Sequence, residues 1–144
     1  FLQNIFYYKF NLFNEHESPW EGTRISQKKN LKSIDYMRQK IKIKNLNAPF
    51  WKFNKEKSIE IIKNGGWHFN SLLEPKEISI KLKTFAHKEF SCLEFSDINI
   101  IKKNISEMRD LFKRDRYYKK IKLDKTFPDY ILQNQDKLKK WILF

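Results

Sequence analysis

The sequence predicts a single α/β domain, and three observations support this fold class. The chain has 144 residues, a length typical of one domain with its own core. Hydrophobic residues make up 40% of the chain and aromatic residues 16%, which indicates a folded protein rather than a disordered one. Stretches rich in aromatic and β-branched residues alternate with stretches whose apolar residues recur at helical spacing. We therefore expect strands flanked by helices.

The first half of the chain begins with strands and continues into a helix. Residues 1–13 are rich in aromatic and β-branched side chains and predict one strand or two short ones. Residues 20–26 follow a polar loop and predict a turn that enters a further strand. Residues 31–44 carry apolar side chains at helical spacing, so we expect a helix there. Residues 45–54 predict a loop with aromatic anchors, and residues 55–63 fit either a strand or a short helix.

The second half of the chain continues this alternation. Residues 69–73 predict a strand. Residues 75–87 predict a helix, because a proline and then an acidic residue stand at its start. Residues 96–113 predict another helix, because a Ser-Asp pair can cap an apolar stripe at helical spacing. Residues 117–123 alternate as a strand does, and residues 129–142, which follow a proline, predict a last amphipathic helix.

The charge of the chain favours anionic partners without identifying one. The formal net charge is +13, but the lysines are scattered along the whole chain, which is typical of a solvated surface. Two clusters interleave aromatic and basic residues, Tyr7-Tyr8-Lys9 and residues 116–120. Base stacking and neutralisation of phosphates need such residues on one face. A small basic nucleic-acid-binding protein without catalysis therefore stays open as an alternative function.

The cysteine content and the chain start bound the class of protein further. Cys92 is the only cysteine, which excludes an internal disulfide and a cysteine-based metal cluster. We expect Cys92 to be a small buried hydrophobic residue. No apolar run approaches the length of a membrane span, and the start shows no signal-peptide pattern. Because the chain begins at Phe1 without a methionine, inside a predicted strand, we expect a fragment of a longer protein.

Two of the three glycines stand side by side in Asn64-Gly65-Gly66-Trp67-His68-Phe69. Paired glycines adopt backbone conformations that other residues disfavour, and they let a backbone approach another group closely. A large aromatic ring and a titratable ring directly after such a turn favour a surface that meets a ligand. The alternative is a turn into a strand, with the tryptophan in the core.

Other titratable residues are candidates for proton transfer or metal binding. His87 and Glu89 lie two residues apart at the expected end of a helix, where they can serve as acid or base. Asp110 and Arg114 lie one helical turn apart, and the alternative for them is an intrahelical ion pair. The three histidines are far apart in sequence and form no metal-binding motif, so any one of them supplies at most a single ligand to a metal held from outside this chain.

Several motifs together resemble the C-terminal half of glycosyltransferase family 17, the β-1,4-mannosyl-glycoprotein 4-β-N-acetylglucosaminyltransferases and their relatives. The resemblance covers the chain from about Phe6. Its three main motifs occur in the family's order: Trp20-Glu21-Gly22-Thr23, Asn64-Gly65-Gly66-Trp67-His68-Phe69 and Lys81-Leu82-Lys83-Thr84-Phe85-Ala86-His87-Lys88-Glu89. Its closing motifs are Asp110-Leu111-Phe112-Lys113-Arg114 and Phe127-Pro128-Asp129-Tyr130-Ile131 followed by Asn134.

The resemblance implies a GT-A-like fold with a mixed sheet flanked by helices. It implies that residues 1–144 are the C-terminal part of one catalytic domain. The implied reaction transfers N-acetylglucosamine or a related sugar from a UDP-sugar donor to a glycan acceptor hydroxyl, with inversion. No Asp-x-Asp motif occurs, so we expect the donor pocket and most ligands of a divalent metal, Mn or Mg, upstream of this chain. We therefore expect the chain to be inactive by itself, without a nucleic-acid partner, and cytoplasmic, or Golgi-luminal in a eukaryotic relative.

The resemblance also implies roles for individual residues. It implies a substrate-binding surface made of Gly65, Gly66, Trp67, His68, His87 and Trp20. Sugars present apolar faces that stack on tryptophan, which suits Trp20 and Trp67. Activation of the acceptor hydroxyl needs a general base, for which Glu89 is the first choice and Asp110 the second. We expect Gly65 to His68, His87 and Glu89 to converge on one concave surface.

Overall fold

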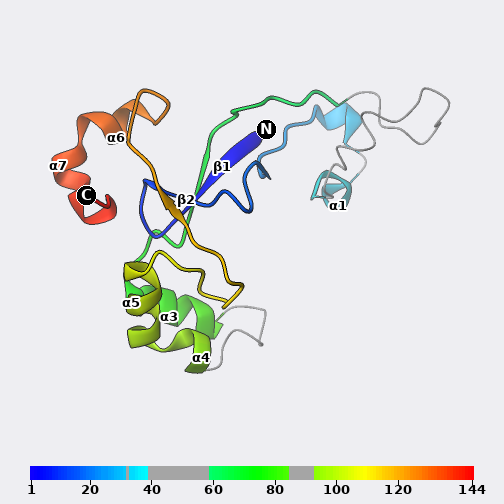
Figure 1. Ribbon diagram of the computed structural model, residues 1–144. Coiled ribbons are helices and arrows are strands. Elements are labelled where there is room, and N and C mark those ends of the chain that lie inside the picture. Colours follow the sequence, from blue (N-terminus) through cyan, green and yellow to red (C-terminus); the bar gives the residue numbers. More distant parts are fainter. Residues whose placement is uncertain (32, 39–58, 85–92) are drawn as a thin grey trace.

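The computed structural model describes residues 1–31, 33–38, 59–84 and 93–144. The described chain is a mixed α/β protein built around a five-stranded sheet (Figure 1). The strands along the main path follow the order β3-β1-β2-β5, and β4 pairs with β1 as well. Their bounds are β1 (Leu2–Tyr7), β2 (Leu12–Phe13), β3 (Trp20–Glu21), β4 (Trp67–Asn70) and β5 (Lys119–Lys120).

Strand β1 is the centre of the sheet. Strands β1 and β2 are antiparallel with Phe6 opposite Phe13, so residues 1–13 form two strands, one of the two predicted arrangements. Strand β3 is also antiparallel to β1. Strand β4 runs parallel to β1 over four residue pairs, from Asn4 opposite Trp67 to Tyr7 opposite Asn70. The sheet is therefore mixed, and this part of the predicted fold class is confirmed.

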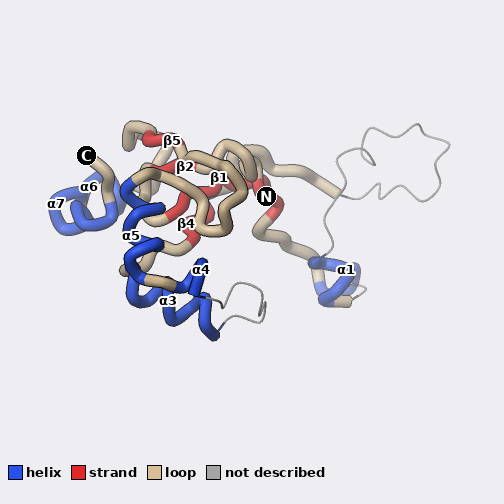
Figure 2. The backbone as a smooth tube through the Cα atoms, turned by 60° about the horizontal axis from the view of Figure 1, so that its bottom comes forward, coloured by secondary structure: helices blue, strands red, loops and turns tan. Residues whose placement is uncertain are grey.

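The helices form two groups and one outlier. Figure 2 shows α3, α4 and α5 together on one side of the sheet, α6 and α7 together at the left of the view, and α1 apart from both groups at the right. Their bounds are α1 (Ile34–Arg38), α3 (Pro75–Thr84), α4 (Leu93–Ser96), α5 (Ile98–Ser106), α6 (Asp129–Gln133) and α7 (Gln135–Leu138), with 3-10 turns at η1 (Lys28–Asn30) and η3 (Lys139–Trp141).

Both faces of the sheet carry a hydrophobic core. Side chains alternate between the faces of a strand, so Ile5 and Tyr7 share one face and Phe6 lies on the other. The first face packs against α3 and α5 through buried residues that include Ile78 and Ile101. On the second face the Phe6 ring contacts the rings of Phe13, Phe69 and Phe127, with centroids 5.3–5.6 Å away. Ile131 of α6 and Trp141 of η3 belong to the second core cluster, which includes Phe69. Burial on both faces is the main stabilising contribution to this arrangement.

The predicted helix 96–113 is wrong in its second half. Helix α5 begins after Asp97, whose carboxylate accepts from the backbone N–H groups of the first turn, but it ends at Ser106. Met108 then has a φ of 55°, which takes the chain out of the helix. The chain folds back on itself instead, because Asp110 N donates to Arg116 O (3.0 Å) and Tyr118 N donates to Met108 O (2.7 Å).

Other predicted elements are right in place and wrong in length. The helix predicted over 129–142 is three short pieces, because Asn134 leaves the helical region with φ −120° and ψ 29°. The strand predicted over 69–73 runs from Trp67 to Asn70 and ends where Ser71 takes a φ of 50°. Residues 20–26, predicted as a turn that enters a strand, begin with the two-residue strand β3, and the strand predicted over 117–123 is reduced to the two residues of β5.

Some predictions fall partly or wholly outside the described residues. Helix α1 covers five residues of the helix predicted over 31–44, and α3 confirms the helix predicted from residue 75 as far as Thr84. Residues 59–62 form neither a helix nor a strand. The loop predicted over 45–54 and the burial expected for Cys92 lie outside the described residues. No helix in the described ranges is long and apolar enough to cross a membrane.

Candidate functional site

Two residues expected to bind a ligand, Trp20 and His68, meet on one face of the sheet. Trp20 on β3 lies opposite Gln3, and His68 on β4 lies opposite Ile5. Gln3 and Ile5 are alternate residues of β1, so their side chains and those of their partners point to the same face. The indole and imidazole rings pack with centroids 3.9 Å apart and an interplanar angle of 40°. Strand register therefore brings together two rings that are far apart in sequence.

The backbone of Gly22 lies directly against the indole of Trp20 and leaves no room for a side chain. A Cβ atom at this position would lie 2.1 Å from Cζ3 of Trp20 and 2.4 Å from Oε1 of Gln3. Any larger residue would therefore displace the indole or the Gln3 side chain. The Gln3 amide in turn donates to Thr23 Oγ1 (3.0 Å), which ties the segment after β3 to β1. We call Trp20, Gly22 and His68 the Trp20 clamp.

The paired glycines bring β4 alongside β1. Gly65 N donates to Leu2 O (2.7 Å), and Asn4 N donates to Gly66 O (3.1 Å). A Cβ atom on Gly65 would lie 2.8 Å from Cβ of Phe1, so the close approach of these backbones requires glycine there. Gly66 has a φ of +134°, which side-chain-bearing residues rarely adopt. The pair therefore has a structural role in strand entry, which was the alternative drawn from the sequence.

Trp67 lies on the face of β4 opposite to His68. The two residues are neighbours in a strand, so their side chains point to opposite faces. Trp67 is 38% exposed, so it is not the core residue of the alternative interpretation either. Of the residues expected on one concave surface, Gly65 to His68 are described, and within them Trp67 and His68 lie on opposite faces of β4, so this part of the expectation is wrong. His87 and Glu89 lie outside the described residues, so their expected positions stay predictions.

The environment of His68 favours the neutral imidazole at pH 7. Burial lowers its pKa below the ordinary 6.5, and the positive charge of Lys81 on α3 lowers it further. The Lys81 ammonium lies 3.5 Å from Oδ1 of Asn70, the next residue on the same face of β4. A neutral imidazole beside an indole can donate and accept hydrogen bonds, as a sugar hydroxyl requires.

We expect the variant Lys81→Ala to raise the pKa of His68 towards 6.5 without reaching it. The substitution removes the repulsive charge but leaves the burial of the imidazole, which is the larger cause of the shift. An NMR titration of the histidine ring protons measures the midpoint. Lys76→Ala, on an exposed position of the same helix, is the matched control and should leave the midpoint unchanged. An unchanged midpoint in Lys81→Ala would contradict the assigned cause.

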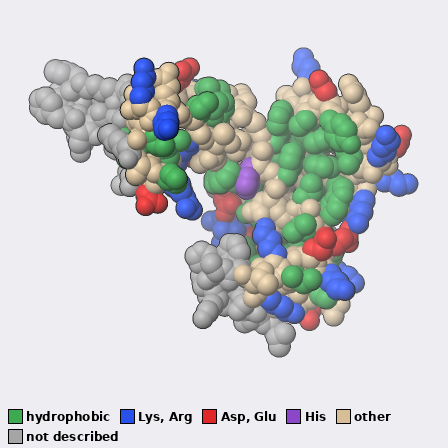
Figure 3. All heavy atoms as spheres, turned by 180° about the vertical axis from the view of Figure 1, so that it is seen from behind, with side chains coloured by type: hydrophobic (Ala, Val, Ile, Leu, Met, Phe, Trp, Pro, Cys, Tyr) green, Lys and Arg blue, Asp and Glu red, His purple; other side chains and the backbone are tan. Residues whose placement is uncertain are grey.

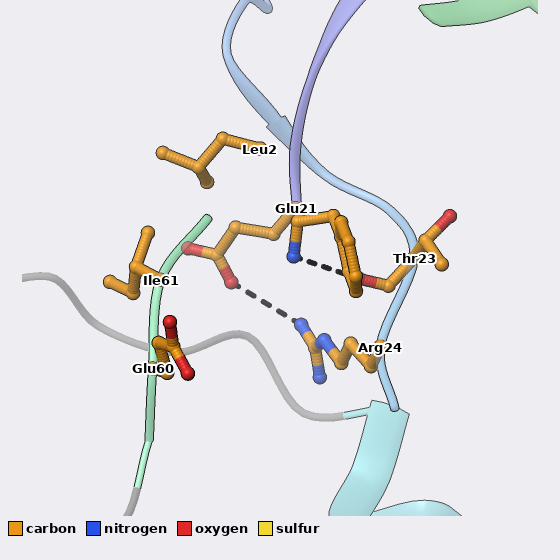
Figure 4. Close-up of a pocket in the computed structure, with 7 residues that line it drawn as sticks. Leu2, Glu21, Thr23, Arg24, Glu60 and Ile61 are labelled. Carbon is orange, nitrogen blue, oxygen red and sulfur yellow. Dashed lines mark hydrogen bonds and ion pairs between the residues drawn. The ribbon is translucent and has the colours of Figure 1, made fainter. Parts of the chain in front are cut away.

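An open hollow lies beside the Trp20 clamp. It measures ≈ 430 Å³. Arg24 connects two parts of its lining, because the guanidinium pairs with Glu21 (3.3 Å) and donates to the backbone carbonyl of Met37. The same Glu21–Arg24 pair also lines a small cavity of ≈ 30 Å³, together with Glu60. Figure 4 shows this cavity and the ion pair. The described residues that line the hollow are Trp20, Glu21, Gly22, Arg24, Met37 and Arg38.

Asp110, the second choice for a general base, is buried in a network of hydrogen bonds. Arg114 donates to both of its oxygens (2.6 and 2.7 Å), Tyr118 donates from its hydroxyl (2.9 Å) and Phe112 from its backbone (3.2 Å). Burial favours a raised pKa, but these donors outweigh it and hold the pKa of Asp110 below 3.8. The ion pair that the sequence suggested does form, across a turn rather than along a helix. A carboxylate so satisfied is a weak base.

Glu17 joins this network to the loop before Trp20, and no sequence pattern pointed to it. Arg114 (2.8 Å) and Arg116 (2.7 Å) donate to one of its oxygens, while Tyr7 and Asn14 donate to the other (3.2 Å each). The charge of Glu17 therefore bridges the 109–118 turn, β1 and the loop that leads into β3. These contacts come from separate parts of the chain, so no local sequence pattern predicts them. Only the spacing of Asp110 and Arg114 indicated an ion pair in this network.

The aromatic residues proposed for base stacking are largely buried. Tyr7, Tyr8 and Tyr118 are 6%, 1% and 3% exposed, so their rings are not available to a nucleic acid. Tyr117 is exposed, and the Arg109 guanidinium lies 5.0 Å from its ring centroid. Figure 3 shows lysine and arginine side chains separated by hydrophobic and acidic ones on the face it presents. The features that suggested nucleic-acid binding therefore do not form one stacking surface.

The described residues do not form a metal centre. No group of three or more His, Cys, Asp or Glu side chains within the described ranges is placed to hold a metal ion. Comparison of the chain with known protein families, curated proteins and solved structures finds no match.

Proposed function

We propose that this chain forms the sugar-binding part of a nucleotide-sugar transferase. The proposed reaction transfers N-acetylglucosamine or a related sugar from a UDP-sugar donor to a glycan acceptor hydroxyl, with inversion. The single observation that carries the proposal is the Trp20 clamp beside an open hollow of ≈ 430 Å³. The indole lines the hollow and offers the apolar surface that a sugar ring stacks on, and the imidazole of His68, which is not among the described lining residues, packs against the indole.

The proposed chemistry sets requirements on the chain. The acceptor oxygen attacks the anomeric carbon from the side opposite to UDP, a base takes the hydroxyl proton, and the bond to UDP breaks. Asp110 is a poor candidate for the base, because its oxygens are occupied and its pKa is lowered. Glu89 therefore stays the first choice. The described residues do not supply a metal site, so we derive no step through a metal on this chain.

The proposal includes a larger catalytic domain of GT-A-like fold. The parallel pair of β1 and β4, with helices packed on the sheet, is compatible with an α/β transferase. In this proposal the donor pocket and the divalent metal belong to an upstream part, and the chain of 144 residues supplies the acceptor side. We accordingly expect no turnover of UDP-N-acetylglucosamine by the chain by itself.

We expect the variant Trp20→Ala to weaken binding of an N-acetylglucosamine disaccharide at least about tenfold, the loss that removal of one stacked ring would cause. Isothermal titration of the 144-residue chain measures it. Tyr130→Ala removes an aromatic ring that is 67% exposed on α6 and is the matched control, which should bind as the unmodified chain does. Equal binding by Trp20→Ala and the unmodified chain would refute the role of the clamp.

The same titration distinguishes the alternative function. A nucleic-acid-binding protein would bind a single-stranded oligonucleotide with an affinity that falls steeply as salt is raised. We expect the disaccharide affinity to change little between low and high salt, because stacking and neutral hydrogen bonds involve no release of counterions. Tight, salt-dependent binding of the oligonucleotide together with no binding of the disaccharide would overturn the proposal.

A further inference from the structure

We propose that the hollow beside the Trp20 clamp accepts an acidic sugar, whose anionic group is recognised by Arg38. This inference rests on the proposed sugar-binding function and adds a substrate class to it. The hollow, at ≈ 430 Å³, lies within the range of about 300–1,000 Å³ typical of small-ligand sites. Trp20 and Gly22 form one part of its lining, and Met37 and Arg38 of α1 form another.

The charges that line the hollow leave Arg38 uncompensated. Glu21 and Arg24 pair with each other at 3.3 Å, so these two charges offset each other. Within the described part of the chain, no carboxylate forms an ion pair with Arg38. The described lining of the hollow therefore carries a net positive charge that comes from this one guanidinium. An anionic ligand would complete it, whereas a neutral ligand would leave this charge without a partner.

Arg38 is anchored next to the clamp rather than carried on a distant helix. Its neighbour Met37 accepts a hydrogen bond from the Arg24 guanidinium through its backbone carbonyl. Arg24 in turn is held by Glu21 of β3, the residue after Trp20. Two contacts thus connect the end of α1 to the strand that carries the indole. This connection places the backbone next to Arg38 near β3, and the Arg38 side chain lines the same hollow as Trp20.

Trp20 and Arg38, which both line the hollow, suit the two chemical features of an acidic sugar. The indole of Trp20 suits the apolar face of the ring, and the planar guanidinium of Arg38 suits a carboxylate or a phosphate, which it can bind through two parallel hydrogen bonds. A uronic acid and a sugar phosphate share this chemistry. The experiment below contains one ligand of each kind, so that it identifies the source of the anion.

The test compares three ligands and four forms of the chain by isothermal titration. The ligands are a neutral N-acetylglucosamine disaccharide, a disaccharide that contains glucuronic acid, and N-acetylglucosamine 6-phosphate. The forms are the unmodified chain, Arg38→Gln, Arg38→Lys and Lys28→Gln. Lys28 lies on the exposed turn η1 and does not line the hollow, so its variant removes one positive charge without touching the site.

We expect the unmodified chain and Lys28→Gln to bind at least one acidic ligand about tenfold more tightly than the neutral disaccharide. Arg38→Gln should lose this preference and keep its affinity for the neutral disaccharide. Arg38→Lys should keep part of the preference, because an ammonium retains the charge but not the planar fork. The acidic ligand that is preferred identifies the carboxylate or the phosphate as the natural group.

Three results would overturn the inference. One is equal affinity of the unmodified chain for acidic and neutral sugars, and another is a preference that survives in Arg38→Gln. The third is competition by UDP without a sugar, since the hollow would then belong to the donor. In the first two cases binding of the neutral disaccharide leaves the proposed function standing, and in the third it leaves sugar binding standing but moves the donor pocket onto this chain. Failure of every sugar to bind would instead refute the proposed function itself.

Discussion

The variant Asp110→Asn is expected to lose about 3 kcal/mol of the free energy of unfolding. The Asp110 side chain is 1% exposed and meets the Arg114 guanidinium through two hydrogen bonds of 2.6 and 2.7 Å. Removing one partner of a buried ion pair typically costs about 3–5 kcal/mol, because the other charge is left without compensation. We take the lower end because Arg114 is 35% exposed and water can partly solvate it. Denaturation by urea measures the loss.

This loss would be a large share of the stability of a domain, which is typically about 5–15 kcal/mol. The matched control is Asp136→Asn on α7, an exposed carboxylate whose removal should change stability by no more than about 0.5 kcal/mol. In a double-mutant cycle with Arg114→Gln, the two losses should not add, because both variants break the same pair. Additive losses, or a loss in Asp110→Asn as small as in the control, would contradict the central role of this ion pair.

The same ion pair predicts how stability depends on pH. The pKa of Asp110 is lower in the folded chain than its ordinary 3.8, so the unfolded chain binds the proton more readily. The stabilising contribution is therefore complete above pH 3.8 and is lost as the pH falls below it through the folded pKa. Asp110→Asn should lack this contribution, and its stability should fall less steeply with acid than that of the unmodified chain.

The variant Gly22→Ala is expected to disrupt the Trp20 clamp and to abolish measurable sugar binding. The added methyl group would lie 2.1 Å from the indole, which is rigid and cannot yield without leaving its place on His68. Overpacking of this kind typically costs about 1–3 kcal/mol of stability. Near-ultraviolet circular dichroism reports the change in the tryptophan environment, and titration with the disaccharide reports the loss of binding.

A second substitution separates the two consequences of Gly22→Ala. In a Trp20→Ala background the clash with the indole is absent, and the flexible Gln3 side chain can move away from the new methyl group. Gly22→Ala should therefore cost less than about 0.5 kcal/mol there. If the cost were the same in both backgrounds, the backbone of Gly22 rather than the indole would be the reason for glycine at this position.

Much of the secondary structure was predictable because its signals are local. Pro75 and Glu77 mark the start of α3, and Asp97 caps α5 as the Ser-Asp pair suggested. The amphipathic stripes of these helices predicted which sides would pack, and Ile78 and Ile101 are buried as expected. Helix ends were less predictable. The sequence pattern of α5 continues to residue 113, but the burial of Asp110 with Arg114 and Tyr118 requires the chain to turn after Ser106.

The sequence by itself determined an α/β chain, and it identified Trp20 and His68 as candidates for ligand binding. Only the tertiary structure decided that these two rings contact each other while Trp67 faces away. It also decided that Gly22 supports the indole and that Asp110 stabilises the fold. The physical reason is that helix caps and periodicity depend on neighbours in sequence, whereas a site at a sheet depends on register. The pairing of β1 with both β3 and β4 sets that register, and it involves residues from three separate parts of the chain.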